Sequence, residues 1–97
     1  MVQYRVKPDR AAENERYIKG VFEQLNRDRP PGLRYGSFKL DDGVSFVHIA
    51  SHDASGRNPL SDLAAFKTFT AMIKDRCEEP PVAVHLNEVG AYRFAGG

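Results

Sequence analysis

Residues 33–51, LRYGSFKLDDGVSFVHIAS, decide the fold because they hold two alternating apolar stretches with a turn between them. An Asp-Gly pair in that setting is the strongest short-range signal of a β-hairpin. Here Asp42 and Gly43 occupy the turn. The stretch therefore predicts an antiparallel pair of strands over residues 33–40 and 44–51.

The same turn fixes which residues face each other across the hairpin. It places Lys39 opposite Phe46 and Ser37 opposite His48. Because side chains alternate along a strand, one face is strongly apolar and carries Phe38, Leu40, Val47 and Ile49. The other face is mixed and carries Tyr35, Ser37, Lys39, Phe46 and His48. We assign the apolar face to the helices and the mixed face to the open side, and we expect both to be covered.

The residues before the hairpin predict a strand and a helix. Residues 2–7 (VQYRVK) alternate, with Val2, Tyr4 and Val6 expected to face the helices. Residues 10–28 predict a helix, because apolar residues recur at helical spacing: Tyr17, Ile18, Val21, Phe22 and Leu25. Asp9 or Asn14 can cap its start, and the Pro-Pro-Gly at residues 30–32 ends it.

The residues after the hairpin repeat this order. Residues 61–77 predict a second helix on the stripe Leu63, Phe66, Thr70, Ile73 and Cys77, widened by Phe69 and Met72. Pro59 suits its first turn, with Asn58, Ser61 or Asp62 as the cap. Residues 82–86 (VAVHL) alternate as a last strand, with Val82, Val84 and Leu86 expected to face the helices. Residues 89–94 are expected to continue this strand after a bulge.

The element order βαββαβ predicts one α+β domain over residues 1–97: a ferredoxin-like plait with an antiparallel sheet and two helices on one face. The open face of such a sheet must be polar or covered by something else. Since both faces of the predicted hairpin carry apolar residues, a second copy of the chain is the simplest cover. We therefore expect a homodimer.

Composition restricts the partners and the compartment. A formal charge of +1 offers no basic field for nucleic acid or for an anionic membrane, and the Lys/Arg-Gly-Phe/Tyr motif of RNA-recognition domains is missing. No apolar run reaches the roughly 18 residues of a membrane span. Residues 1–7 lack the apolar core of a signal peptide, and the single cysteine excludes an internal disulfide. The expected location is the cytoplasm.

The sequence predicts neither a metal site nor a cofactor. The three histidines lack the helical spacing that lets ligands converge on a metal, and no phosphate-binding glycine loop or nucleophile elbow is present. Cys77 continues the apolar stripe of the second helix, so we read it as a small buried hydrophobe rather than as a nucleophile.

Aromatic residues supply the candidate ligand-binding site. Tyr4, Phe22, Phe66 and Phe69 can all approach the space between the sheet and the helices, where a cavity would suit a flat hydrophobic molecule. A plain aromatic core is the alternative. Because Phe69 flanks the main stripe, we predict that Phe66 is fully buried and that Phe69 borders a pocket or the partner subunit.

The LRY…DDGVSFVHI hairpin and the helix written NPLSDLAAFKTF resemble the dimeric α/β-barrel superfamily, and within it the antibiotic-biosynthesis-monooxygenase-like proteins. The resemblance spans nearly the whole chain. It implies a homodimer whose two sheets close into a barrel, with a pocket between sheet and helices in each subunit. Members that oxygenate anthrone-like polyketides without a cofactor typically use a tryptophan with an asparagine, plus an arginine or a histidine on the second helix. This chain has no tryptophan, and its residues 61–77 hold neither histidine nor asparagine.

Two functions follow. The first is a cofactor-independent monooxygenase acting on an aromatic or quinol-like molecule, with His48, His85 or Tyr35 as the base or hydrogen-bonding group. The second is a non-catalytic dimer that binds a small hydrophobic ligand or serves as a stress-response barrel.

The predicted facing also implies a pH dependence. It places Arg5 and His85 beside His48 on the open face, where a second subunit would cover them. Desolvation and like charge would keep both histidines neutral. The dimer is then expected to weaken below about pH 6, because exposed histidines titrate near 6.5.

Overall fold

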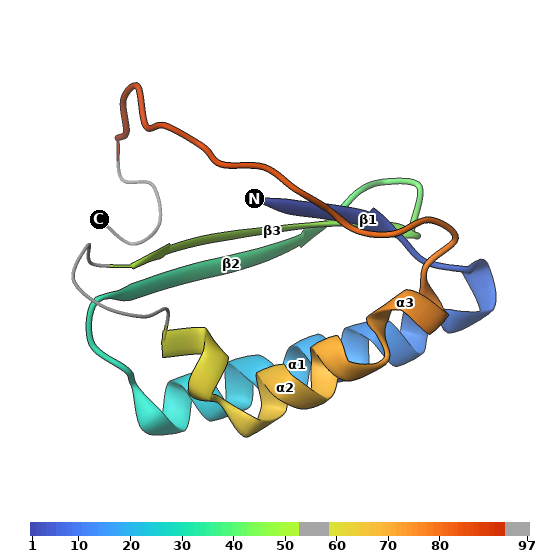
Figure 1. Cartoon of the computed structure of the whole chain (residues 1–97), viewed down its shortest axis with the longest axis horizontal. Coiled ribbons are helices and arrows are strands. Elements are labelled where there is room, and N and C mark those ends of the chain that lie inside the picture. Colours follow the sequence, from blue (N-terminus) through green and yellow to red (C-terminus); the bar gives the residue numbers. More distant parts are fainter. Residues whose placement is uncertain (53–58, 93–97) are drawn as a thin grey trace.

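The computed structural model describes residues 1–52 and 59–92 and shows an α+β architecture, with the helices on one face of an antiparallel sheet (Figure 1). The strands are β1 (Val2–Arg5), β2 (Leu33–Lys39), β3 (Ser45–His52) and β4 (Val82–Ala83). The helices are α1 (Ala11–Asp28), α2 (Ala64–Ala71) and α3 (Ile73–Arg76), with 3₁₀ turns at Pro8–Arg10 and Pro59–Asp62. The strand order β2-β3-β1-β4 is compatible with the predicted ferredoxin-like plait.

The predicted hairpin register is confirmed. Lys39 pairs with Phe46, and Ser37 pairs with His48. The turn is held by the Asp42 carboxylate, which accepts hydrogen bonds from the backbone N–H of Ser45 at 2.8 Å and from its hydroxyl at 2.6 Å. Gly43 adopts φ 77°, a left-handed conformation that favours glycine.

The predicted facing of the hairpin is wrong. Phe46 pairs directly with Tyr4 across β3 and β1, and the two rings stack at 5.6 Å on the face toward the helices. Lys39 shares this face, since its Nζ lies 3.3 Å from Glu15 of α1. Phe38, from the set assigned to the helices, is 52% exposed on the open face. The prediction assigned to the helices the face with more apolar side chains. The pairing of β1 with β3 instead puts the aromatic rings of Tyr4 and Phe46 together on the face toward the helices.

The open face therefore carries the aliphatic set. Leu40 is exposed, and Val47 and Ile49 are half-buried. The expectation that Val2, Tyr4 and Val6 face the helices agrees with their burial: Val2 is partly buried, and the other two are buried in the core.

The first helix forms nearly as predicted. It ends where Arg29 takes the left-handed conformation, φ 45°, and donates its backbone N–H to Leu25 O at 2.8 Å. Neither predicted capping residue caps its start: the N-cap position is Arg10, which makes no side-chain cap hydrogen bond. Asn14 lies inside the helix and is fully buried.

The second helix is interrupted, contrary to the prediction of one helix over residues 61–77. It breaks at Met72, where φ is −119°, into α2 and α3. Near the break the hydroxyl of Thr70 donates to the backbone oxygens of Phe66 and Lys67, a type of bond that bends helices. The predicted caps Ser61 and Asp62 lie in the preceding 3₁₀ turn, and Asn58 is outside the described residues.

A residue of α1, and not the N-cap residue Leu63, accepts a hydrogen bond from the first turn of α2. Gln24 Oε1 accepts the backbone N–H of Ala65 at 2.8 Å. The prediction for the two phenylalanines of α2 is reversed, because Phe69 is 3% exposed and Phe66 is only partly buried. Both rings lie within α2, before the break, and α2 turns Phe69 toward the rings of Tyr4 and His48.

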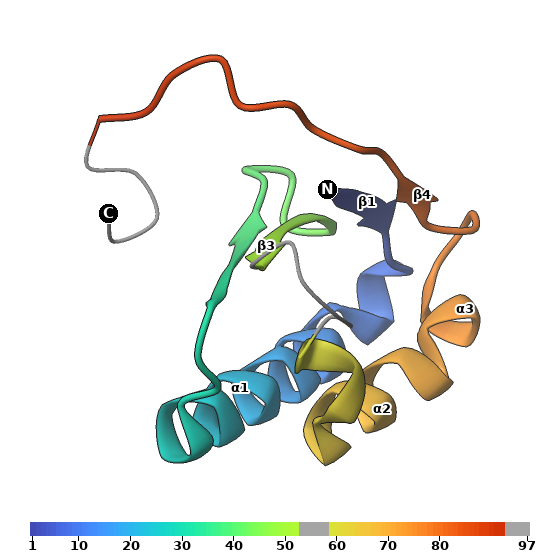
Figure 2. The ribbon, with the colours of Figure 1, turned by 60° about the vertical axis from the view of Figure 1, so that its left-hand side comes forward.

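The last strand is shorter than predicted. Only β4 is assigned, although Met1 and Val84 still exchange backbone hydrogen bonds of 2.7 Å. The chain then runs past the sheet on the side opposite the helices (Figures 1 and 2). Contrary to the prediction, the last-strand residues do not face the helices: Val82, Val84 and Leu86 are all exposed, and Val82 pairs with Gln3. Of the predicted continuation over residues 89–94, residues 89–92 form no strand, and residues 93–94 lie outside the described residues. None of the helices described is both long and apolar enough to cross a membrane.

Candidate functional site, a buried histidine network

The space between the sheet and the helices is filled by stacked rings with a histidine at their centre. His48 of β3 lies 5.3 Å from the ring of Tyr4, 5.3 Å from Phe69 and 5.8 Å from Tyr35, measured between centroids. Phe22 of α1 stacks on the outer side of Tyr35 at 5.3 Å. The layer that the sequence offered as either a cavity or an aromatic core is thus packed by aromatic side chains.

Both ring nitrogens of His48 have tyrosine partners. Its Nε2 lies 2.7 Å from Tyr4 Oη, and its Nδ1 lies 2.7 Å from Tyr35 Oη and 2.8 Å from Ser37 Oγ. The imidazole is 5% exposed, and this desolvation lowers its pKa from 6.5 to about 4. His48 is therefore neutral near pH 7, with one nitrogen donating and the other accepting.

The tyrosine hydroxyls on either side of the histidine are equally shielded. Burial raises the pKa of Tyr4, mainly by desolvation and against a hydrogen bond from Asn14. Burial also raises the pKa of Tyr35, again against a hydrogen bond, here with Ser37. Both phenols consequently stay protonated and can act as hydrogen-bond donors at neutral pH.

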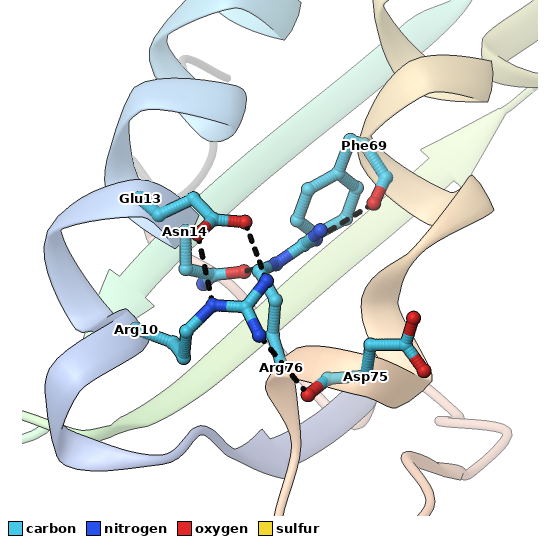
Figure 3. A network of polar contacts seen from close by, with 6 residues as sticks. All are labelled: Arg10, Glu13, Asn14, Phe69, Asp75 and Arg76. Carbon is cyan, nitrogen blue, oxygen red and sulfur yellow. Dashed lines mark hydrogen bonds and ion pairs between the residues drawn. The ribbon is translucent and has the colours of Figure 1, made fainter.

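The network continues from Tyr4 to an arginine. Asn14 Nδ2 donates to Tyr4 Oη at 2.9 Å, and Arg76 Nε donates to Asn14 Oδ1 at 3.0 Å. Arg76 Nη2 also donates to Phe69 O at 2.7 Å, a carbonyl near the end of α2 (Figure 3). The break at Met72 thus lets the α3 residue Arg76 reach back to α2 and across to α1.

The guanidinium of Arg76 is fully buried without a paired carboxylate among the described residues. The nearby acid Glu13 is held by Arg10 through two hydrogen bonds of 2.8 Å (Figure 3). Instead, the Arg76 guanidinium lies 4.6 Å from the ring centre of Tyr17 and 5.4 Å from that of Phe69, distances of cation–π contacts.

One nitrogen of Arg76, Nη1, is buried and has no hydrogen-bond partner in the described part of the chain. An unsatisfied buried donor on a charged group costs roughly 1–3 kcal/mol or more. The positive charge of Arg76 also lowers the pKa values of Tyr4 and Cys77, and so offsets part of the rise that desolvation causes.

A surface pocket of about 280 Å³ shares a residue with this network. Tyr35 lines it together with mainly apolar and cationic neighbours: Phe22, Leu25, Asn26, Arg29, Pro30 and Leu33. A second pocket of about 420 Å³ lies over the edge of β1 beside Glu79, Pro80 and Val82. Tyr35 is thus the one member of the His48 network that lines the first pocket.

The structure unites some predicted site residues and separates others. His48 and Tyr35 are in direct contact, whereas His85 is exposed in the segment after β4 and takes no part in the network. His48 does not lie beside Arg5 on the open face, so the geometry assumed for a pH-sensitive dimer interface is wrong. The desolvation that keeps His48 neutral comes from its own subunit.

The four aromatic candidates for ligand binding all pack in one layer. Tyr4 and Phe69 are buried in it, and Phe22 and Phe66 are partly buried at its outer side. Phe22 lines the pocket beside Tyr35, and Tyr4 lines the pocket at the edge of β1. Phe66 and Phe69 line neither of these two pockets.

Sequence reasoning missed Asn14 and Arg76. Each is a polar residue at a position of an apolar helical stripe: Asn14 comes one turn before Tyr17 and Ile18, and Arg76 comes three residues after Ile73. A polar side chain on the buried face of a helix was the signal that could have found them.

Metal binding and thiol chemistry find no support among the described residues. Among residues 1–52 and 59–92, no three His, Cys, Asp or Glu side chains are grouped as metal ligands. Burial raises the pKa of the Cys77 thiol, and so opposes the formation of a nucleophilic thiolate.

Comparison with known proteins adds no name to this site: no family model, no curated protein and no solved structure matches the chain. The geometry of the network and of the surfaces around it is therefore the basis for a function.

Proposed function

We propose that this protein is a cofactor-independent monooxygenase for small aromatic molecules with an acidic C–H or O–H group, such as anthrones and quinols. The observation that supports this best is the buried neutral His48, held on both ring nitrogens by tyrosine hydroxyls. Proton transfer and oxyanion stabilisation both use a titratable ring with partners of this kind.

The proposed chemistry uses the substrate as its own electron source. The anionic form of an anthrone carries enough electron density on carbon to react with O₂ directly. One oxygen atom then enters the substrate as a carbonyl, and the other leaves as water with the two hydrogens of the CH₂ group. The contribution of His48 and Tyr35 is to favour the anionic form, as a base or as hydrogen-bond donors to its oxygen.

The proposed binding place is the pocket that Tyr35 lines. Its volume of about 280 Å³ lies just below the range of ligand pockets, roughly 300 to 1,000 Å³, and so suits only a small ligand. Phe22 and Leu33 offer apolar surface for a flat ring, and Arg29 offers a positive charge near an anionic oxygen. A small aromatic oxyanion therefore matches the chemistry of the lining.

We further propose that the protein is a homodimer of the dimeric α/β-barrel type, whose subunits cover each other's open sheet face. Phe38 is 52% exposed and Leu40 is 41% exposed on that face. Val82, Val84 and Leu86, from β4 and the segment after it, add further exposed apolar surface. Large apolar side chains exposed on the open face of a sheet favour an interface over a surface that faces water.

Oxygen uptake with a panel of dihydroxyanthrones and quinols tests the catalytic proposal. The expected result is oxygen consumption above the spontaneous rate, with a product that has gained one oxygen atom by mass spectrometry. Folded protein that consumes no oxygen across the panel would contradict the proposal.

Non-catalytic ligand binding is the second candidate, because stacked rings fill the layer between sheet and helices and the pocket beside Tyr35 is small. The same panel distinguishes the two functions in a thermal-shift experiment. Ligands that raise the melting temperature and are recovered unchanged favour binding alone.

Analytical ultracentrifugation of Phe38→Lys tests the dimer. Met72→Lys is a matched control, because Met72 is also 52% exposed but lies between α2 and α3. We expect the first variant to shift the protein toward monomer and the second to leave it dimeric. A wild-type protein that is monomeric at neutral pH would refute the barrel assembly.

A further inference from the structure

The direction of each hydrogen bond in the buried network can be assigned from its arginine end. A guanidinium has only donors, so the atom of Asn14 that faces Arg76 Nε must be the acceptor Oδ1. The amide nitrogen of Asn14 is then the atom that lies 2.9 Å from Tyr4 Oη. Turning the amide over would place two donors against each other between two fully buried side chains.

The orientation of the Asn14 amide in turn decides which nitrogen of His48 is protonated. Tyr4 Oη accepts from Asn14, and the Tyr4 proton needs an acceptor of its own. His48 Nε2, at 2.7 Å, is the other described partner of this hydroxyl. If Nε2 carried a proton, the Tyr4 O–H would have no acceptor in a side chain that is 4% exposed. Such a loss costs roughly 1–3 kcal/mol, enough to decide a tautomer.

We infer that Arg76 and Asn14 are positioning residues that fix neutral His48 as its Nδ1–H tautomer. The proton on Nδ1 points to Tyr35 Oη and Ser37 Oγ, and both hydroxyl oxygens can accept it. Donation therefore runs in one direction, from Arg76 through Asn14, Tyr4 and His48 to the residues beside the pocket.

The direction of hydrogen-bond donation decides which role His48 has in the proposed function, and this conclusion rests on that function. In the Nδ1–H form the nitrogen near Tyr35 cannot take up a proton, because it already holds one. The network then acts as a hydrogen-bond donor that stabilises an oxyanion, and not as the base that removes the substrate proton. The substrate proton leaves to solvent, which reaches the surface pocket beside Tyr35. A ligand that carries a phenolate, enolate or carbonyl oxygen fits this polarity.

The Asn14→Asp variant tests the inference, because it reverses the polarity with almost no change of shape. A carboxylate accepts from Arg76 and from the Tyr4 O–H alike, and it supplies the counter-charge that Arg76 lacks. Tyr4 Oη is then free to accept from His48. We expect the proton of His48 to move from Nδ1 in the wild type to Nε2 in the variant.

Long-range ¹H–¹⁵N NMR correlation at pH 8 reads the tautomer, because protonated and unprotonated ring nitrogens differ in ¹⁵N chemical shift. The exposed His85 in the same spectra is an internal control that should not change. A wild-type His48 with its proton on Nε2 overturns the inference even if the variant does not fold. A wild-type Nδ1–H that persists in Asn14→Asp overturns the positioning role of Asn14 and Arg76.

The measurement needs no substrate and is independent of the proposed activity. The expected tautomers in a protein that never consumes oxygen would refute the monooxygenase proposal and leave the inference standing. With turnover present, Asn14→Asp is expected to lower kcat at least tenfold, because the donor to the substrate oxygen is lost. An unchanged kcat in a variant with the switched tautomer would refute the donor role.

Discussion

Acidification should destabilise the folded protein through His48. Burial lowers the pKa of this residue from 6.5 to about 4, so the folded state binds its proton more weakly than the unfolded state does. The stability contributed by neutral His48 is therefore complete above pH 6.5 and is lost as the pH falls toward 4. Between pH 7.5 and pH 5.0 this linkage amounts to about 2 kcal/mol of unfolding free energy.

Urea denaturation at the two pH values, at one fixed protein concentration, measures the effect. His48→Gln is the reference, because it removes this titration and keeps the other acid-sensitive groups, among them Glu13 and Asp42, whose pKa values are lowered by hydrogen bonds. We expect the wild type to lose about 2 kcal/mol more than the variant on going to pH 5. Equal losses in both proteins would refute the burial and the low pKa of His48.

Three further predictions concern packing and local conformation. Phe69→Ala should cost about 3–5 kcal/mol by urea denaturation and Phe66→Ala clearly less, since only the first ring is fully buried; equal losses would contradict this. Gly20→Ala should stabilise the protein by about 0.5–1 kcal/mol, because a Cβ there meets open space in a helix, whereas Gly43→Ala should destabilise it by about 1–2 kcal/mol at its positive φ; thermal melts that show the same sign for both would be inconsistent with the two conformations. Tyr4→Phe should cost about 1–3 kcal/mol because two buried partners lose their hydrogen bonds; a neutral effect in urea would mean that the network is open to water.

The parts of the fold that depend on local chemistry could be predicted. The Asp42-Gly43 turn determines the hairpin register through contacts within a few residues, and the register of Ser37 with His48 follows from it. The first helix has a continuous apolar stripe and a proline stop, and its bounds are nearly as predicted. Such signals do not depend on what the rest of the chain does.

The facing of the hairpin could not be predicted from its own residues. It depends on the pairing of Tyr4 with Phe46 across β1 and β3, which no turn connects. It also depends on the hydrogen bonds that make His48 tolerable in the core. An alternation pattern gives the two faces of a strand but not the face that the helices cover.

The buried network was only half visible in the sequence. His48 and Tyr35 were candidates because of their chemistry, and the register brought them to one face. Asn14 and Arg76 become part of the site through the break at Met72, and no proline or glycine in residues 61–77 indicates that break. A charged residue inside an apolar stripe was the available sign, and its partner Asn14 lies 62 residues away in the sequence.

If His48 is the central residue of a catalytic site, its loss lowers the rate of oxygen uptake, whereas loss of a histidine outside the network does not. His48→Gln removes the central residue, and His85→Gln changes an exposed histidine outside the network. Acid–base and hydrogen-bonding groups contribute roughly 10²–10⁴-fold to a rate. On a dihydroxyanthrone substrate, we expect wild-type turnover that falls by about 10²-fold or more in His48→Gln and is unchanged in His85→Gln. Equal rates in the two variants, or no turnover by the wild type, would contradict a catalytic role of His48.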